Sequence, residues 1–427
     1  MTIASLEHLV AAGGARVVLV DNGSVQPLTD VDLAHLPGVE VVRSSRNLGF
    51  GGGVNLALDH LGVGRPGRPP RADAPTHIAL VNNDAFVEPG WLDPLVRALE
   101  ADPAVGAASS KLVFEPEFVP VVVESTLVAQ RRGPALGAAV SGPTGTVFGP
   151  GFVAVRPGDW RAVAERAVVF VPLAAGDATV GDATAGDAVV GDAAPIDAAG
   201  SLRVDGAGGG VSIGAPGARC SVVQNAGNEL TDGLWVRDRG AREPDDGRYD
   251  AAADVWGWCG GAVLLRGAYL ADVGWFDERL FLYWEDVDLS WRGARRGWRY
   301  RYVPDSVVRH RHGASMGDRS ARFEYLNQRN RLVVLARHAG LARAGRAWAR
   351  QVAEIAWFAG RDVLGAPARG ERPNGHRVAV RARALARAVA LLARRPDPAA
   401  SPGSQVAGRS GRWGHEWRPA DRARPEP

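Results

Sequence analysis

The sequence is poor in the residues that build disulfide-rich, zinc-bound or membrane-spanning proteins. It has only two cysteines, Cys220 and Cys259, and a single lysine, Lys111. Two cysteines cannot form a disulfide framework or a four-thiolate zinc site, so a reducing compartment is the default expectation. The sequence has no run of about 18 apolar residues, as a membrane span requires, and residues 1–14 lack the pattern of a signal peptide. These absences predict a cytoplasmic protein and leave open a peripheral attachment to the inner face of the plasma membrane.

The composition is that of an ordinary soluble protein. The 427 residues are 46% hydrophobic and 23% charged, with a formal net charge of +3. The length allows two or three domains, and so small a net charge does not indicate a nucleic-acid partner. The excess of Arg over Lys, together with much Ala, Gly and Val, indicates a high-GC genome and carries no functional weight.

Five segments follow one another along the chain. The first and third alternate helix and strand patterns, which predicts an α/β fold with a mostly parallel central sheet. The second is rich in Val, Pro and Gly and contains a five-residue Gly-Asp-Ala repeat that starts at Gly176, so we expect a β-rich insertion with an irregular loop. The fourth is a basic helical region that mixes Arg with Ala, Val and Leu, and it favours either an amphipathic helix on anionic lipid or solvated bundle helices. The segments are residues 1–115, 116–224, 225–335, 336–395 and a tail at 396–427 that should be disordered.

Within the first segment the pattern is clear enough to predict single elements. Val/Ile/Leu-rich runs predict strands, and apolar residues at helical spacing predict helices. We expect strands at 17–20, 39–42, 78–81 and 105–114, a helix at 91–101, and a Gly-rich turn feeding a helix over 47–58.

Two of these apolar runs end on polar turns that carry carboxylates. Continuous Val/Ile/Leu runs are typical of buried parallel strands, and ligands of open α/β sheets bind beyond the carboxyl ends of such strands. The two polar turns therefore predict a pocket for a polar ligand that carries a metal. The alternative is that they are ordinary strand-to-loop turns, which favour the same residue types. The polar residues are Asp21, Asn22 and Ser24 after the first run, and Asn82, Asn83 and Asp84 after the second.

A Gly-rich stretch runs from Asn47 through Gly49 and Phe50 to Asn55. Glycines ahead of a helix let backbone N–H groups approach a phosphate closely. The stretch is neither a Walker motif nor a dinucleotide fingerprint, so alone it is weak evidence of phosphate binding.

Three acids open a predicted helix near residue 285. Glu285, Asp286 and Asp288 stand at its start and arginines at its far end, which the helix dipole alone would favour. Four bulky apolar residues precede the acids, however, and would place them in a partly dry pocket. A carboxylate there has a raised pKa, which suits a general base.

Metal ligands are suggested at two places. Asn82 and Asp84 offer the hard oxygen atoms that hold magnesium or manganese when substrate phosphates complete the shell. His310 and His312 would face the same side of an extended segment, within reach of one metal or diphosphate. Capping turns and inert exposed histidines are the alternatives.

In this order the motifs closely resemble family 2 glycosyltransferases, and the nearest branch looks like the bacterial rhamnosyl- and galactofuranosyltransferase-like enzymes. The resemblance covers roughly residues 1–115 and 222–335. It implies a GT-A fold, a nucleotide-diphosphate sugar donor, a divalent metal (Mg or Mn), inversion at the anomeric carbon and a cell-envelope glycan or lipid-linked acceptor. The motifs are Val-Asp-Asn-Gly-Ser, Asn-Leu-Gly-Phe, Asn-Asn-Asp, Cys-Gly-Gly-Ala with a downstream Phe-Asp-Glu, Tyr-Trp-Glu-Asp-Val-Asp-Leu-Ser-Trp-Arg and His-Arg-His-Gly-Ala-Ser.

The same resemblance implies residue roles. Asp286 would deprotonate the acceptor hydroxyl, with Glu285 beside it. Asp84 would bind the metal, with Asn82 as the weaker partner and His310 or His312 completing the site. Donor contacts are implied for Asp21, Asn22, Ser24, Asn47, Gly49, Phe50, Asn55, Asn83, Gly260 and Gly261. Acceptor contacts are implied for Asp277, Trp284 and Asp288.

The chain departs from the family pattern at its start. The family opens with a strand ending in Tyr-Asn or Trp-Asn, whereas this sequence begins in what resembles the following helix, at residues 2–12. Either the start codon is placed too far downstream or part of the donor pocket has been lost, and we favour the misplaced start. A non-catalytic sugar-nucleotide or glycan-binding relative is therefore the main alternative to an enzyme. A nucleotidyltransferase is disfavoured because a basic phosphate loop is missing.

Overall fold

The computed structural model describes residues 1–115, 220–231, 235–311, 320–370 and 372–394, and the backbone of five strands between residues 118 and 216. The predicted tail at 396–427, most of the Gly-Asp repeat and His312 lie outside the described residues. The five strands are β6 (Phe118–Ser125), β7 (Arg166–Pro172), β8 (Val189–Val190), β9 (Ala194–Pro195) and β10 (Val211–Pro216), of which β10, β6 and β7 form one antiparallel sheet.

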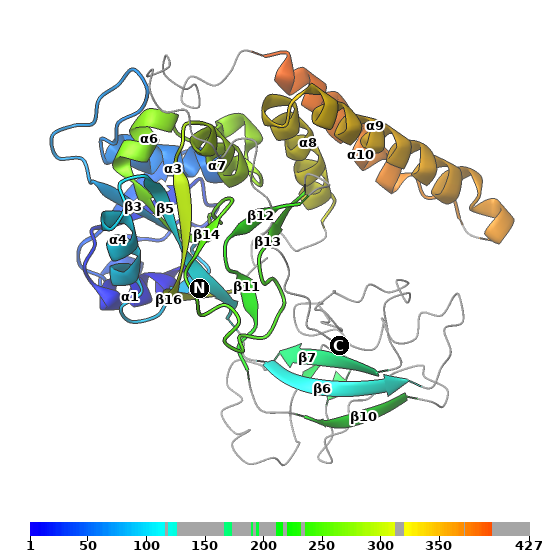
Figure 1. Ribbon diagram of the computed structural model, residues 1–427, viewed down its shortest axis with the longest axis horizontal. Helices are drawn as coiled ribbons and strands as arrows, with labels where there is room; N and C mark the ends of the chain where they lie inside the picture. The colour runs from blue at the N-terminus through cyan, green and yellow to red at the C-terminus, as the bar shows by residue number, and fades with distance from the viewer. Residues whose placement is uncertain are drawn as a thin grey trace.

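The first 115 residues alternate helices and strands as predicted (Figure 1). Every predicted element is present within a few residues of its expected bounds. The elements are α1 (Thr2–Ala12), β1 (Val17–Asn22), α2 (Asp30–Leu33), β2 (Val39–Ser44), α3 (Gly49–His60), β3 (His77–Val81), β4 (Ala85–Val87), α4 (Leu92–Glu100) and β5 (Val105–Phe114).

The chain resumes its α/β character after residue 222 and then becomes helical. The predicted acid-led helix is α7. The elements are β11 (Val223–Asn225), β12 (Asn228–Leu230), β13 (Val236–Asp238), β14 (Ala253–Val255), β15 (Ala262–Arg266), α6 (Gly267–Val273), η4 (Glu278–Leu280), α7 (Glu285–Arg295), β16 (Arg299–His310), α8 (Ala321–His338), α9 (Leu341–Phe358), η5 (Ala359–Leu364), η6 (Pro367–Arg369) and α10 (His376–Leu392).

Seven strands form the central sheet. Its path is β14-β16-β5-β15-β3, with β11 added to β5 and β4 added to β16. The predicted α/β class is confirmed, but the sheet is mixed rather than mostly parallel. Strand β16 runs parallel to β5, whereas β15 runs antiparallel to both β3 and β5. The reason is that β15 enters the sheet between two strands of the first segment from the opposite end.

Strands β1 and β2 form a parallel pair of their own, in register from Val17 opposite Val39 to Asn22 opposite Ser44. Helix α3 contacts both of these strands, and its Leu58 joins the core that also holds Ile78 of β3. In the described part of the chain β3 is paired with β15 alone. The expected first strand of the family stays a prediction.

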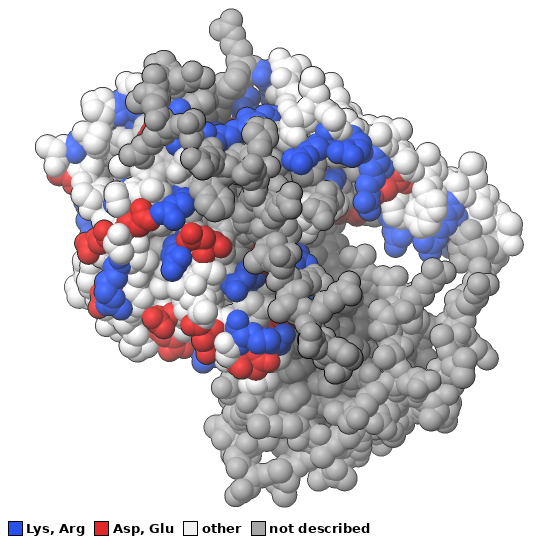
Figure 2. Space-filling view, in the orientation of Figure 1, with Lys and Arg blue, Asp and Glu red and all other residues white. Residues whose placement is uncertain are grey.

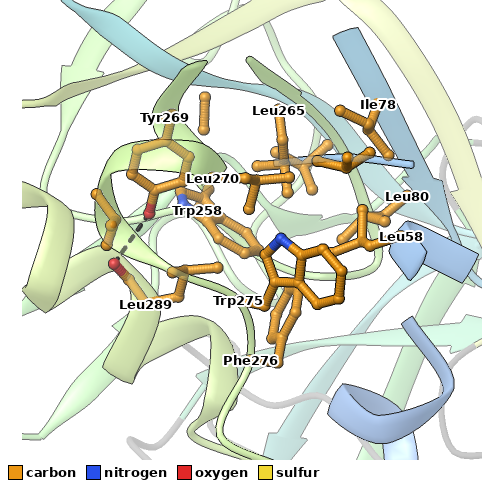
Figure 3. Close-up of a cluster of buried hydrophobic side chains, with 14 of the residues drawn as sticks. Leu58, Ile78, Leu80, Trp258, Leu265, Tyr269, Leu270, Trp275, Phe276 and Leu289 are labelled. Carbon is orange, nitrogen blue, oxygen red and sulfur yellow. Dashed lines mark hydrogen bonds between the residues drawn. The ribbon is translucent and has the colours of Figure 1, made fainter. Parts of the chain in front are cut away.

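The core explains why β15 is apolar at every position from Ala262 to Leu265. Its Val263 and Leu265 face one cluster, centred on Trp258 and Trp275, while Leu264 faces a second cluster under α4. Alternate residues of a strand point to opposite faces, so a strand covered on both sides has no polar position. In the first cluster the Tyr269 hydroxyl donates to the Leu289 carbonyl at 2.9 Å and so ties the core to α7 (Figure 3).

One buried charge fastens the sheet to a neighbouring loop. Lys111 of β5 is 5% exposed. Its Nζ donates to Asp245 at 2.9 Å and to Asp250 at 2.6 Å. The two carboxylates supply the charge partners that a buried ammonium needs.

The C-terminal helices pack against one another, and α9 and α10 project from the rest of the protein as a two-helix arm (Figure 1). None of the described helices combines the length and the apolar character that a bilayer crossing needs. The predicted C-terminal helical region is confirmed.

Candidate active site

The end of β1 opens on a cavity of about 540 Å³ that Asp21, Ser24 and Arg43 help to line. The Ser24 backbone N–H donates to the Asp21 carboxylate at 3.0 Å, and the Arg43 guanidinium donates to it at 2.7 Å. The Ser24 hydrogen bonds and the Arg43 charge hold the pKa of Asp21 below its usual value, which keeps the carboxylate ionised. An ionised, held carboxylate in an open cavity can accept hydrogen bonds from a ribose or a base edge.

Asn22, next in the strand, is used inside the protein. Its Nδ2 donates to the Gly49 carbonyl and its Oδ1 accepts from the Leu48 N–H, both at 2.8 Å. Asn47 Oδ1 in turn accepts from the Gly49 N–H at 2.8 Å. These bonds shape the Gly-rich turn, so the structure gives Asn22 and Asn47 a role in holding that turn against β1.

The Gly-rich turn contacts the segment that precedes α7 directly. Gly49 has φ +79°, and a Cβ placed there would lie 2.1 Å from the Phe281 carbonyl oxygen, so only glycine fits. The Phe50 N–H donates to that same carbonyl at 2.7 Å. Asn55, 4% exposed, donates to the Phe276 carbonyl at 2.9 Å and accepts from the Phe276 N–H at 3.1 Å. The turn and helix α3 are therefore joined to the chain just before α7.

The candidate metal ligands meet at the ends of β3 and β16. Asp84 Oδ1 lies 2.9 Å from His310 Nε2, and Asn82 Nδ2 lies 3.2 Å from the same nitrogen. Asp84 and His310 are 6% and 5% exposed. Asn83 points elsewhere and donates to the Thr2 hydroxyl at 3.1 Å.

No pattern in the sequence pointed to Gln224, which orients this histidine. Its Oε1 lies 2.9 Å from His310 Nδ1. An amide oxygen accepts the Nδ1 proton, which directs Nε2 toward Asp84, as the outer partners of metal-bound histidines do. Only the pairing of β11 with β5 brings residue 224 here, and no local pattern records that pairing.

The donor set fits a divalent cation that a diphosphate completes. A carboxylate, an imidazole nitrogen and an amide oxygen from Asp84, His310 and Asn82 suit Mn²⁺ or Mg²⁺. The described residues contain no cluster of three or more His, Cys, Asp and Glu side chains arranged for a metal.

The acidic pair lies at the first turn of α7. Burial raises the pKa of both Glu285 and Asp286, and the neighbouring Asp286 charge raises that of Glu285 further. The Val287 and Gly260 N–H groups donate to Asp286 at 2.7 and 3.3 Å, which fixes its orientation. Glu285 Oε2 is buried and has no hydrogen-bond partner among the described residues. Carboxylates with raised pKa values can take up a proton near neutral pH.

The acidic pair and the metal ligands meet at two consecutive glycines. Gly260 donates to Asp286, while the Gly261 carbonyl accepts from the Asn82 N–H at 3.0 Å. A Cβ on Gly261 would lie 3.7 Å from His310 Cε1, and one on Gly260 would lie 3.2 Å from the Phe50 ring. The Gly-rich turn, the metal ligands and the acids, which are far apart in sequence, thus surround one short segment.

The three predicted acceptor residues are buried. Asp277 is paired with Arg279 and Arg337, each at 2.7 Å, and Asp288 with Arg292 at 2.9 Å and His338 at 2.8 Å. Burial opposes ionisation of Asp288, but its partners outweigh burial and hold its pKa well below the usual value. Trp284 donates from Nε1 to Asn327 at 3.2 Å. Their contacts serve the fold, and an acceptor role for them stays a prediction.

The comparisons with known proteins agree with this geometry. Residues 2–156 match the family described as Glycosyl transferase family 2. An N-acetylglucosaminyl-diphospho-decaprenol L-rhamnosyltransferase of Mycobacterium tuberculosis (strain H37Rv) is 24% identical over 338 residues, which are 78% of each chain. Residues 2–156 of this chain therefore carry a family 2 glycosyltransferase domain.

Two further similarities of this glycosyltransferase are narrower. A pre-mycofactocin glycosyltransferase of Mycobacterium tuberculosis is 43% identical over 61 residues, 14% of this chain and 13% of the relative. A solved structure of GalNAc-T7 with UDP, GalNAc and Mn²⁺ aligns with 75% of this chain at 13% identity and a TM-score of 0.39. This alignment spans 41% of the solved chain, and a likeness this weak carries no argument about ligands. Because the rhamnosyltransferase matches over most of both chains, the predicted rhamnosyltransferase-like branch is confirmed.

Proposed function

We propose that this glycosyltransferase moves a sugar, with inversion, from a nucleotide-diphosphate donor of the dTDP-rhamnose or UDP-sugar type to a cell-envelope glycan or lipid-linked acceptor. The convergence of Asp286, Asn82 and His310 on Gly260 and Gly261 carries the proposal. The nucleoside would lie at Asp21, and the diphosphate between the Gly-rich turn and Asp84. The rhamnosyltransferase relative supports a lipid-linked acceptor by its name.

The residues suit a single displacement. The acceptor oxygen forms a bond to the anomeric carbon, the bond from that carbon to the diphosphate oxygen breaks, and the acceptor proton passes to Asp286. The two backbone N–H groups on Asp286 hold its carboxylate in place for this transfer. Glu285, whose buried Oε2 has no hydrogen-bond partner among the described residues, would bind the acceptor. A bound Mg²⁺ or Mn²⁺, held by Asp84, His310 and Asn82, would neutralise charge on the departing diphosphate.

The test is donor hydrolysis and transfer with a panel of nucleotide sugars, with Mg²⁺ or Mn²⁺ and after chelation. The wild-type chain is compared with Asp84→Ala and Asp286→Asn. Asp254→Asn is the matched control, because Asp254 pairs with Arg301 on the surface of β14 and β16. Metal-dependent turnover that both site variants lose and the control keeps supports the proposal. Nucleotide binding without turnover on any donor and acceptor would favour a non-catalytic binding protein.

We also propose that the arm formed by α9 and α10 contacts an anionic membrane surface. Trp357 and Leu364, toward its free end, are 55% and 78% exposed. Every exposed position between Arg350 and Arg361 is uncharged. Arg361 stacks over the Trp357 ring at 5.1 Å, and Figure 2 shows basic side chains gathered along the arm. Exposed apolar residues flanked by arginine are typical of helices that lie in a lipid interface.

Vesicle sedimentation tests this contact independently of activity. The protein should bind vesicles that contain phosphatidylglycerol and not pure phosphatidylcholine, and salt should weaken the binding. The double variant Trp357→Ala, Leu364→Ala should bind less. Leu341→Ala is the control, because Leu341 is 93% exposed at the opposite end of α9. Equal loss in the control, or equal binding to both lipids, would contradict the assignment.

A further inference from the structure

The segment that leads into the acidic pair is held in a strained conformation. Phe281, Tyr283 and Trp284 have φ values of 68°, 69° and 72°. Phe281, with ψ −60°, forms a γ-turn in which the Leu282 N–H donates to the Leu280 carbonyl at 2.8 Å. Positive φ is costly for bulky residues, and γ-turns of this hand are rare. Such a conformation persists only where the surroundings enforce it.

Helix α8 supplies the enforcing contacts through Asn330. This residue is fully buried, and its Nδ2 donates to the carbonyls of Leu280, Leu282 and Tyr283 at 2.9, 2.9 and 2.7 Å. An amide nitrogen has two hydrogens, so at least one is shared between two carbonyls. Arg329 Nε donates to Asn330 Oδ1 at 2.8 Å, which orients the amide with its nitrogen toward the loop.

The clamped segment touches both halves of the site. Its Phe281 carbonyl accepts from the Phe50 N–H of the Gly-rich turn, and Trp284 is the residue directly before Glu285 and Asp286. A shift of this loop would therefore move the turn and the acids together.

We propose that Asn330 is a positioning residue. Through its hydrogen bonds to the carbonyls of residues 280, 282 and 283, it fixes the position of the Gly-rich turn relative to the Glu285–Asp286 pair for sugar transfer. The inference rests on the proposed function, since the relative position of the Gly-rich turn and the acidic pair matters only if they act on one donor and one acceptor. Asn330 itself would touch neither substrate.

The decisive variant is Asn330→Asp. It keeps the size of the side chain but replaces the donating nitrogen with an oxygen that repels the three carbonyls. We expect kcat to fall about 100-fold, as for a displacement of roughly 1 Å in a catalytic group. The donor KM should rise by a smaller factor, because the displaced turn weakens the diphosphate contacts while Asp21, held by Ser24 and Arg43, keeps those to the nucleoside.

Two further readouts separate positioning from a loss of stability. Loosening the loop admits water to the acids, so their raised pKa values should fall and the acid limb of the pH–rate profile should move to lower pH. Amide hydrogen exchange should increase in peptides covering residues 280–286 and also 47–52. Leu335→Ala is the control, because Leu335 is buried on the same helix and contributes no hydrogen bond to the loop.

The outcomes are distinct. Wild-type protein that transfers no sugar refutes the proposed function, while coupled exchange at both peptides would still support the clamp. An active wild type with an Asn330→Asp variant of unchanged kcat and pH limb overturns the inference. Increased exchange at 280–286 without an increase at 47–52 also overturns it, as does a pH shift of the same size in Leu335→Ala.

Discussion

The two strands of the proposed nucleotide side and the sheet that carries the rest of the candidate site are held in different ways. Every residue of β1 and β2 is at least partly exposed, and the pair has no third strand among the described residues. Nine of the ten residues of β5 are buried between two apolar clusters. The difference indicates that the donor side opens at lower free energy than the catalytic side, as ligand-binding elements commonly do.

The largest expected effect is on the catalytic side. Asp286→Asn should lower kcat about 10²–10⁴-fold, because the amide cannot accept the acceptor proton. Donor KM should stay close to that of the wild type. Steady-state kinetics with varied donor checks the prediction, and a variant that loses donor binding together with kcat would contradict the separation of the two sides.

The buried ion pairs behind α7 should dominate stability. Asp288→Asn should lower the free energy of unfolding by about 3–5 kcal/mol, because it leaves Arg292 and His338 without their carboxylate. The pKa of Asp288 is lower in the folded protein than in the unfolded chain. The ionised Asp288 of the wild type therefore adds its full stability at pH values above the usual pKa of aspartate. This stability is lost as the pH falls through the pKa of Asp288 in the folded protein.

Urea titration measures this loss of stability. Glu229→Gln is the control, since its partner Arg237 is half exposed and the expected change is about 0–1 kcal/mol. Similar losses of unfolding free energy in both variants would show that the buried ion pairs of α7 stabilise the protein no more than an exposed pair does.

A substitution on the proposed donor side should change the donor KM rather than kcat. Asp21→Asn removes the ionised acceptor in the cavity at β1, and we expect the donor KM to rise about 10-fold with kcat little changed. Thermal unfolding should change little, since β1 adds few contacts to the core. A fall in kcat with constant KM would place Asp21 outside the donor site.

The smallest effect is on local opening. Hydrogen exchange should be faster in residues 17–22 and 39–44 than in 105–114, and a bound nucleotide should slow only the first two segments. Uniform exchange across the three segments would remove the contrast between the two sheets.

Local patterns sufficed for much of the fold. Apolar runs located β1, β3 and β5, and the acids followed by arginines located α7 at 285–295. The antiparallel entry of β15 was not predictable, because a strand covered on both faces reads the same in either direction.

The candidate site divides in the same way. Motif order predicted Asp84, His310, Glu285 and Asp286, and the structure brings them to one place. The neighbouring sequence does not indicate whether the side-chain amides of Asn22, Asn47 and Asn55 bind a ligand or the backbone of a nearby segment. Gln224 and Asn330 were missed because their partners lie 86 and about 50 residues away in sequence.

Lys111 makes the fold easy to interrogate chemically. The only ε-amine of the chain lies on β5, a central strand of the main sheet, and is held by two carboxylates. A lysine-directed acylating reagent therefore has no exposed side-chain target while the sheet is intact. Acylation of Lys111 would report the opening of β5, so the rate of modification would measure how fast the central sheet unfolds.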